Sequence, residues 1–192
     1  MKRNEYKIKA KVKLLDLGCG TNKKEGHFGI DISPVKGVDL VYDLSNGIPF
    51  PNNSIDKIFT KHFLEHIDNL LYLIEEMFRV LKLGGIAEII VPHWSWYGSY
   101  TFMHKRFFHS FDFYFLEPGN LSNYYTKAKF RVLSVKLNWG RFLNQPTIFG
   151  YPIFRWMNKI ANFILNINLK ISEEFFVKIF SPKEIRVILK KV

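Results

Sequence analysis

The chain has 192 residues, 47% of them hydrophobic, which is enough to bury the core of a single domain spanning residues 1–192. This apolar content and 17% aromatic residues exclude a disordered chain. The 28 lysine and arginine residues outnumber the 17 acidic residues, so the net charge is +11. The excess favours anionic partners such as nucleic acid, phosphorylated substrates or an acidic membrane surface, although codon bias toward lysine also explains it.

A disulfide framework is excluded as well, because Cys19 is the only cysteine. The basic amino terminus is not followed by an apolar core, so we expect no secretory signal. No uncharged apolar run reaches the roughly 18 residues that a membrane-spanning helix needs. We therefore expect a cytoplasmic protein.

The first predicted strand, residues 12–17, leads directly into the turn Gly18-Cys19-Gly20. A Gly-x-Gly turn provides backbone freedom and lets a ligand approach the backbone closely. In open α/β sheets the ligand lies beyond the carboxyl ends of the strands. The turn, with Asp16 just before it, therefore predicts a ligand site.

The second predicted strand, residues 28–32, carries the acidic side chain Asp31 near its end. A carboxylate in this place accepts both hydroxyl hydrogens of a ribose, so we expect a ligand with a nucleoside. The polar link of residues 21–27 is shorter than an ordinary parallel crossover. Any first helix must therefore be abbreviated.

The next stretch adds two strands, residues 38–42 and 55–60, on either side of the turn-rich segment 46–54. Strands four and five are separated by a predicted helix, which extends from Ile67 to Leu81. Its apolar positions have the spacing of one helical face, at residues 67, 70, 71, 74, 77, 78 and 81.

Gly84 and Gly85 are expected to end this helix as a left-handed cap. A fifth strand follows over residues 86–91. Strands that alternate with helices predict a parallel, doubly wound α/β sheet.

Five motifs follow one another between residues 12 and 92. They are Leu14 to Gly20, Gly29 to Ile32, Ile48 to Asp56, Leu64 to Ile67 and Arg79 to Gly85. In residue type, order and spacing they resemble the motifs of class I S-adenosylmethionine-dependent methyltransferases, of the type that includes the ubiquinone and menaquinone methyltransferases. Five ordered motifs are far more specific than one glycine turn.

The resemblance implies a mostly parallel, seven-stranded, Rossmann-like sheet that binds S-adenosylmethionine across its strand ends. By similarity, the glycine turn approaches the methionine portion, Asp31 takes the ribose hydroxyls, Asp43 with Leu44 borders the adenine, and Thr60 lies near the sulfonium. The cofactor-binding residues implied in this way are Asp16, Gly18, Cys19, Gly20, Asp31, Ile32, Asp43, Leu44, Thr60 and His62. Asn22 departs from the family, which often has a third glycine in this place.

Residues 93–125 follow the fifth strand and are crowded with aromatic side chains. We expect this segment to lie over the cofactor as a lid or as a wall of the acceptor site. Residues 131–138 alternate like a sixth strand, and residues 185–190 fit a seventh, antiparallel strand.

An additional helix is predicted within residues 151–170, from Ile153 to Leu169, with one narrow polar stripe. Such a helix either binds a membrane surface or a partner, or packs against the lid or the sheet. We favour packing, because a domain also needs helices that bury most of their surface. Residues 172–180 fit either a helix or a strand.

His62, Glu65 and His66 match the His-x-x-Glu-His pattern that binds zinc in inverted metalloproteases when it lies on a helix. Here a predicted strand directly precedes the pattern, and Leu64 to Ile67 belongs to the methyltransferase-like motifs. We therefore expect no metal, and we place His62 at the cofactor pocket.

Methyl transfer needs a general base only when the acceptor keeps its proton at the working pH. Imidazole titrates near neutrality, so His93, His104 and His109 are the candidate catalytic residues. Each is also explained as a hydrogen-bonded residue of the lid. Lys105 and Arg106 fit a clamp for an anionic acceptor or a solvated basic face.

We expect methyl transfer from S-adenosylmethionine to an oxygen, nitrogen or carbon of a small or medium-sized acceptor. The charge and the basic, aromatic lid make an RNA methyltransferase, or an RNA-associated partner, the alternative. A nonenzymatic cofactor-binding or membrane-peripheral protein is a third interpretation. A nicotinamide dehydrogenase shares the glycine turn and Asp31, and only the later motifs argue against it.

Overall fold

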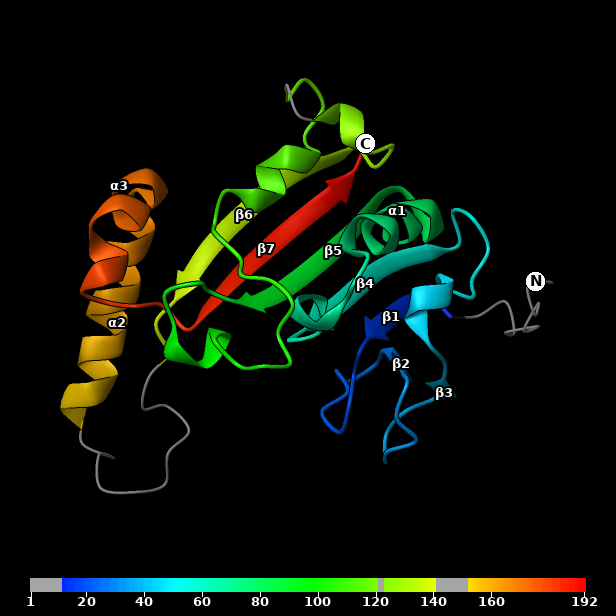
Figure 1. The fold of residues 1–192 in the computed structure, drawn as a ribbon, viewed down its shortest axis with the longest axis horizontal. Coiled ribbons are helices and arrows are strands. Elements are labelled where there is room, and N and C mark those ends of the chain that lie inside the picture. Colours follow the sequence, from blue (N-terminus) through cyan, green and yellow to red (C-terminus); the bar gives the residue numbers. More distant parts are fainter. Residues whose placement is uncertain (1–11, 121–122, 141–151) are drawn as a thin grey trace.

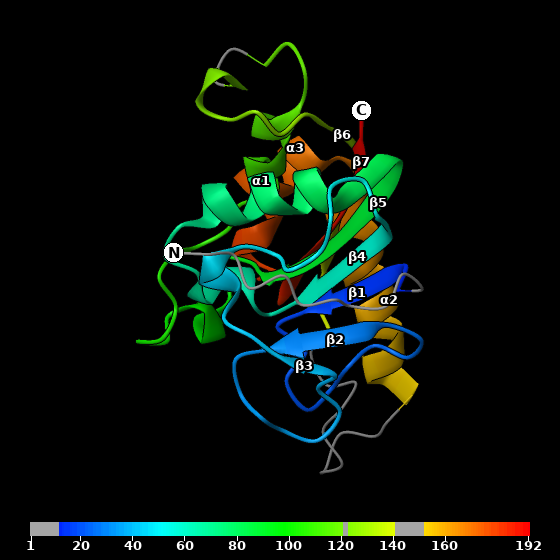
Figure 2. The ribbon, with the colours of Figure 1, turned by 90° about the vertical axis from the view of Figure 1, so that its right-hand side faces the viewer.

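The computed structural model of the chain describes residues 12–120, 123–140 and 152–192. Its centre is a seven-stranded sheet with the order β3-β2-β1-β4-β5-β7-β6 (Figure 1). The strands are β1 (Leu14–Leu17), β2 (Phe28–Asp31), β3 (Leu40–Val41), β4 (Ile55–Lys61), β5 (Leu81–Pro92), β6 (Phe130–Asn138) and β7 (Glu184–Lys191). Figure 2 shows the order from β5 to β3 along one half of the sheet.

Strands β1 to β5 are parallel, whereas β7 is antiparallel to both β5 and β6. The predicted mostly parallel, seven-stranded sheet is therefore confirmed. In β7, Ile185, Val187 and Leu189 are fully buried and alternate with the exposed Arg186, as expected for a strand with one face on the core. In β1, Leu15, Asp16 and Leu17 are all buried, because the strand lies inside the sheet between β2 and β4.

Helix α1 (Leu70–Val80) connects β4 to β5 and buries Leu73, Ile74, Met77 and Val80. Residues 18–54, all of which are described, contain no α-helix and only a single 3-10 turn, Leu44–Asn46. The expectation of an abbreviated first helix is therefore confirmed. The links between the first strands are loops, which leave their carboxyl ends open.

The predicted glycine cap of α1 is wrong. The helix ends at Val80, β5 begins at Leu81, and residues 84–85 lie inside β5. The buried ammonium group of Lys191 binds the end of the helix instead, donating to the carbonyl oxygens of Phe78 at 2.6 Å and Leu81 at 2.7 Å. A cation at a helix C-terminus satisfies carbonyls that have no partner within the helix and interacts favourably with the helix dipole.

Helices α2 (Pro152–Ile167) and α3 (Leu169–Glu174) lie beside β6 at one end of the sheet (Figure 1). The polar stripe of α2 faces the domain. Asn162 accepts a hydrogen bond from the backbone N–H of Trp139 at 2.7 Å, and Asn166 bonds both the N–H and the carbonyl of Leu137. These asparagines pair backbone groups at the edge of β6, which an uncovered edge strand leaves open.

The packing of α2 is therefore confirmed: Ala161 and Leu165 are buried in the core, while other apolar residues face outward. The described apolar residues of α2 that are more than half exposed are Trp156, Ile160, Phe163 and Ile167. Residues 172–180 contain the end of α3 and a 3-10 turn, Phe176–Lys178, and no strand. None of the helices among the described residues is long and apolar enough to cross a membrane.

Arg79 on α1 fixes the turn between β3 and β4. Its guanidinium group pairs with the buried carboxylate of Glu76 at 2.7 Å and donates to the carbonyl oxygens of Ile48 and Phe50. The same carboxylate accepts from the backbone N–H of Ile48 at 2.8 Å. One ion pair thus joins the helix to a loop that has no regular structure of its own.

Replacing Arg79 with alanine should lower the free energy of unfolding by about 2–3 kcal/mol, because it removes the cation that partners a buried carboxylate. Urea denaturation followed by circular dichroism measures this loss. Lys82→Ala breaks an exposed pair with Asp56 and should leave the stability nearly unchanged. Equal stabilities of the two variants would contradict this role of Arg79.

Candidate functional site

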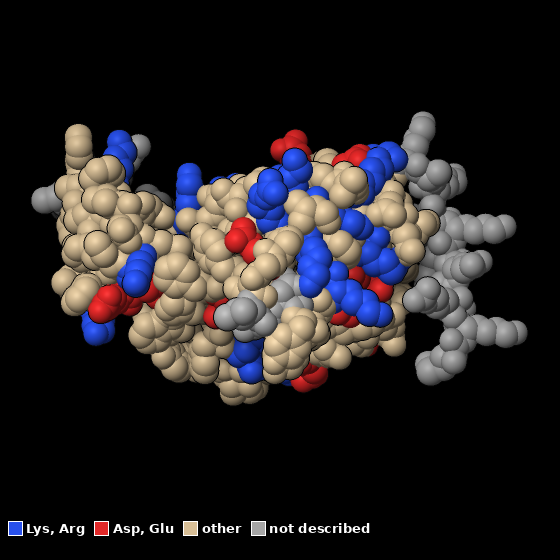
Figure 3. Space-filling view, turned by 90° about the horizontal axis from the view of Figure 1, so that it is seen from above, with Lys and Arg blue, Asp and Glu red and all other residues tan. Residues whose placement is uncertain are grey.

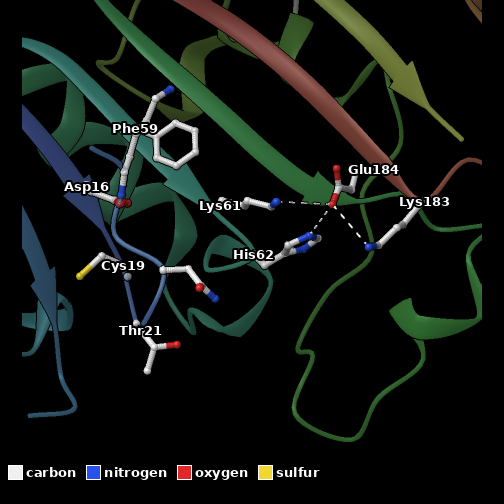
Figure 4. A pocket seen from close by; sticks show the side chains of 12 residues that line it. Asp16, Cys19, Thr21, Phe59, Lys61, His62, Lys183 and Glu184 are labelled. Atoms are coloured by element: carbon white, nitrogen blue, oxygen red, sulfur yellow. Dashed lines mark hydrogen bonds and ion pairs between the residues drawn. The ribbon is translucent and has the colours of Figure 1, made fainter. Parts of the chain in front are cut away.

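A cavity of about 630 Å³ lies where β1 and β4 end and β7 begins (Figure 4). Its volume is typical of sites that bind small molecules and cofactors. Five of the predicted cofactor-binding residues line it: Asp16, Gly18, Cys19, Gly20 and His62. This is the position at which parallel α/β sheets bind their ligands.

The two glycines of the turn after β1 have different roles. Gly18 has a φ of +65°, and a Cβ atom there would lie 2.2 Å from the ring of Phe63, so a side chain has no room. Gly20 has a φ of +49°, and nothing lies within 4 Å of the place where its Cβ would be. The backbone at Gly20 is therefore open to close approach by a ligand.

Asp31 supports this turn from the end of β2. Its carboxylate accepts hydrogen bonds from the backbone N–H groups of Gly20 and Ser33, both at 2.9 Å. Asp31 itself does not line the cavity. Because each carboxylate oxygen accepts more than one hydrogen bond, Asp31 keeps acceptor capacity beside the glycine turn.

The other four predicted cofactor-binding residues also lie outside the cavity lining. Ile32 is exposed, Asp43 accepts a hydrogen bond from the backbone N–H of Ser45, and Leu44 is part of the core. Thr60 is fully buried, because β4 continues to Lys61. Their roles in binding stay predictions.

Asp16 lies at the inner end of the cavity beside Lys24. Burial raises the pKa of Asp16, although its carboxylate accepts a hydrogen bond from the backbone N–H of Lys24 at 2.7 Å. The side chain of Lys24 passes over the ring of Phe59 and reaches Glu88 at 2.9 Å. Burial opposes the charge of Glu88, but Lys57 and Lys24 bind it and bring its pKa to about 2.

His62 and Glu184 form the charged side of the cavity. Their side chains are joined at 2.9 Å, and the ammonium groups of Lys183 and Lys61 lie 3.9 and 4.0 Å from the same carboxylate (Figure 4). Burial disfavours the charged form of His62, but the carboxylates of Glu184 and Glu65 outweigh it and raise the pKa of His62 to about 9. Burial likewise opposes the charge of Glu184, and His62 lowers its pKa nonetheless.

Residues 15–89, which contain the glycine turn, match the family model of the methyltransferase domain. Over these residues the chain is similar to S-adenosylmethionine-dependent methyltransferase domains. Adenosylmethionine is the cofactor of this family, and the open glycine turn beside Asp31 fits such a ligand.

Two curated relatives of the methyltransferase domain carry names of quinone-modifying enzymes. A 2-methyl-6-phytyl-1,4-hydroquinone methyltransferase of Oryza sativa is 28% identical over 102 residues, which cover 53% of this chain and 29% of that protein. A demethylmenaquinone methyltransferase of Listeria welshimeri is 27% identical over 113 residues, which cover 43% of this chain and 48% of that protein. The chain thus spans less than half the length of these relatives.

The solved structure of a SAM-dependent methyltransferase from Archaeoglobus fulgidus has the same fold. It superposes with a TM-score of 0.59 at 20% identity and covers 94% of this chain and 86% of its own.

The sequence interpretation missed several residues that line the cavity of the methyltransferase domain. They are Thr21, Lys24, Phe59, Lys61, Lys183 and Glu184, together with Asn22, which was noted only as a departure from the family. Thr21, Asn22 and Lys24 follow the glycine turn closely enough for its position to have suggested them. Lys183 and Glu184 have no such signal, because only the pairing of β7 with β5 brings them here.

The predicted catalytic histidines do not line the cavity. His93 is fully buried, and its Nε2 lies 3.1 Å from the carboxylate of Glu173, which also contacts Nε2 of His109 at 3.1 Å. Burial opposes the charge of Glu173, but His93 and Ser110 bind it and bring its pKa to about 2. This cluster attaches the segment after β5 to α3, and a part in catalysis stays a prediction for both histidines.

His104, the third candidate, lies apart from this cluster. Its ring packs edge-on against that of His66, with ring centroids 4.8 Å apart. The His-x-x-Glu-His pattern is not on an α-helix, because β4 ends at Lys61 and residues 64–66 form one 3-10 turn. His62, with a φ of +51°, turns instead toward Glu184.

The ion pairs of His62 make stability depend on pH in a defined direction. Because the folded protein raises the pKa from its ordinary 6.5 to about 9, the stabilisation is complete below pH 6.5 and is lost as the pH rises toward 9. Denaturation of the wild type and of His62→Gln at pH 6 to 9.5 measures this. The variant should lose less stability over this range, and an identical decline in both proteins would show that another group is responsible.

Proposed function

We propose that this chain transfers the methyl group of S-adenosylmethionine to a small or medium-sized acceptor. The observation that carries the proposal is the open glycine turn at Gly20, which faces a cavity of about 630 Å³ and is hydrogen-bonded to Asp31. Loop links instead of helices around this turn leave room for a ligand at the strand ends. A glycine turn, an acidic residue and a cavity are the features that bind a nucleoside-bearing cofactor in such sheets.

Adenosylmethionine supplies a methyl group already activated by a positively charged sulfur. The chain therefore has to hold the acceptor in line and to exclude water. Asp31 offers its remaining lone pairs to the ribose hydroxyls. At the other side of the cavity, the cationic groups of Lys61, His62 and Lys183 around Glu184 suit an anionic group of the cofactor or the acceptor.

His62 acts in this proposal as a positive charge at the wall of the cavity and not as a general base, because both of its ring nitrogens already face the carboxylates of Glu184 and Glu65. Its pKa of about 9 keeps the imidazole protonated near neutral pH. A protonated imidazole stabilises a deprotonated oxygen on the acceptor, which then needs no base. The quinone names of two relatives make a hydroxylated aromatic ring the first class of acceptor to examine.

Calorimetric titration with adenosylmethionine, its demethylated product adenosylhomocysteine, and NAD tests the cofactor. We expect saturable binding of the two sulfur nucleosides and none of NAD. Asp31→Ala should bind both at least about 100-fold more weakly, because two hydrogen bonds to a charged group are lost. Asp56→Ala, which removes an acid far from the cavity, is the control and should bind as the wild type does.

The variant Asp31→Ala also loses its bonds to Gly20 and Ser33, so its thermal unfolding is measured in parallel. A folded variant with unchanged affinity would refute the assignment of Asp31. Failure of the wild type to bind either sulfur nucleoside would refute the proposed function itself.

An attachment to an anionic membrane surface is the second candidate function, and the outward-facing apolar residues of α2 support it. Trp156, Ile160, Phe163 and Ile167 follow one another at helical spacing on the exposed side. Lys159 lies within this helix, with its ammonium group 5.4 Å from the ring of Trp156. Figure 3 shows few charged side chains over the α2 and α3 end of this face, whereas Lys and Arg gather over the other end. An apolar side with flanking cations is typical of helices at lipid surfaces.

Sedimentation with vesicles tests this attachment. The wild type should sediment with vesicles that contain anionic phospholipid, and the double variant Trp156→Ser, Phe163→Ser should remain largely in solution because it removes the two aromatic anchors. Leu133→Ser is the control, since this half-exposed apolar residue lies on β6. Equal sedimentation of all three proteins would exclude α2 as the attachment.

A further inference from the structure

Three metal-ligating side chains converge outside the cavity. Glu65 and His66 belong to the 3-10 turn that follows β4, η2 (Leu64–His66), and His104 belongs to the segment after β5. One ligand atom from each of the three lies within 4.8 Å of the other two. The sequence pattern pairs His62 with His66, but the fold pairs His104 with His66 instead.

Both imidazoles are oriented by a backbone carbonyl group. Nδ1 of His66 lies 3.1 Å from the carbonyl oxygen of Met103, and Nδ1 of His104 lies 3.0 Å from that of Ser99. A carbonyl oxygen only accepts, so Nδ1 is the donor in both rings, and in the neutral imidazole the lone pair is then on Nε2. A backbone carbonyl bonded to the far nitrogen is the usual support of a metal-ligating histidine.

The carboxylate of Glu65 gives independent evidence that this cluster binds a cation. Its side chain is completely buried, and neither carboxylate oxygen has a hydrogen-bond partner among the described residues. Oε1 forms an ion pair with His62, whose Nδ1 lies 3.3 Å away and whose Nε2 is bonded to Glu184. A buried carboxylate without hydrogen bonds is costly, and a metal ion at its second oxygen removes that cost.

We infer that Glu65, His66 and His104 bind a divalent transition-metal ion. Two imidazole nitrogens and one carboxylate oxygen form a ligand set that Zn²⁺ takes at about 2.0–2.2 Å. Tetrahedral geometry at this bond length places the ligand atoms about 3.3–3.5 Å apart. The ligand atoms of the three side chains, which lie within 4.8 Å of one another, therefore have to move at least about 1 Å closer together. His66 and His104 are only partly buried, which gives the ion a path from solvent and leaves a position for water.

Such an ion fastens the segment after β5 to the domain beside the cavity. Hydrogen bonds already join the two, because the backbone N–H of Lys105 donates to the carbonyl of Glu65 at 2.8 Å, and the guanidinium group of Arg106 donates to the carbonyls of Ile67 and Asp68. The metal adds a bond through His104. Since His62 lines the cavity and contacts Glu65, the ion fixes the wall next to the proposed methyl-transfer site.

Titration of the untagged, chelator-treated chain with Zn²⁺ tests the site. We expect one equivalent to bind and the thermal unfolding temperature to rise with zinc. His104→Ala and Glu65→Gln should each weaken zinc binding at least about 100-fold, because each removes a ligand. His109→Ala is the matched control, since this histidine lies in the same segment but contacts Glu173 instead, and it should bind zinc as the wild type does.

Cobalt adds a spectroscopic readout. Bound Co²⁺ should show visible d–d bands without a thiolate charge-transfer band, because Cys19 is not in the cluster. A thiolate band, equal weakening in His109→Ala, or no zinc binding by the wild type would each overturn the inference. If His104→Ala does not fold, His66→Ala replaces it as the ligand variant. Adenosylhomocysteine binding by each variant reports on the cofactor site separately.

Discussion

The position of β7 between β5 and β6 is the constraint on which the rest of the structure depends. This antiparallel strand carries a functional charge at each end: Glu184 reaches the cavity, and Lys191 reaches the end of α1. Between them, Arg186 pairs with Glu88 of β5 at 2.6 Å. A shift of the register by one residue would turn all three side chains to the opposite face. The last strand of the chain therefore holds together the helix, the sheet and the candidate site.

Buried carboxylates organise the segment after β5. Glu173 draws together His93, His109 and the backbone of Ser110, so it fastens one part of this segment to α3. Glu65 lies under another part, and within the described part of the chain its carboxylate has an ion pair with His62 but no hydrogen bond. Glu173 is fully paired, whereas Glu65 is not. This difference distinguishes a structural cluster from a candidate metal-binding site.

The loop links of the first half have a direct effect on the site. Without α-helices between β1 and β4, the glycine turn and Asp31 are held by backbone hydrogen bonds, such as those from Gly18 N–H to the carbonyl of Ile30 and from Gly20 N–H to Asp31. The carboxyl ends of the strands remain uncovered from this side. The segment after β5 has its loops at the ends of β4 and β5 (Figure 1), but none of its described residues lines the cavity, so its part as a lid stays a prediction.

The sequence by itself determined the strands, α1 and the glycine turn, because local patterns decide these features. The alternation in β7 and the Gly-x-Gly after β1 are recognised from a few neighbouring residues. Asp16, the turn and His62, which the sequence predicts at the cofactor site, all line the cavity. Only the tertiary structure decided which side chains from distant parts of the sequence contact one another. Lys191 replaces the glycine cap of α1, Glu184 partners His62, and His104 joins His66, although each pair is far apart in the chain. No local pattern encodes such contacts, because they arise from strand order and register, which form only when the whole sheet is assembled.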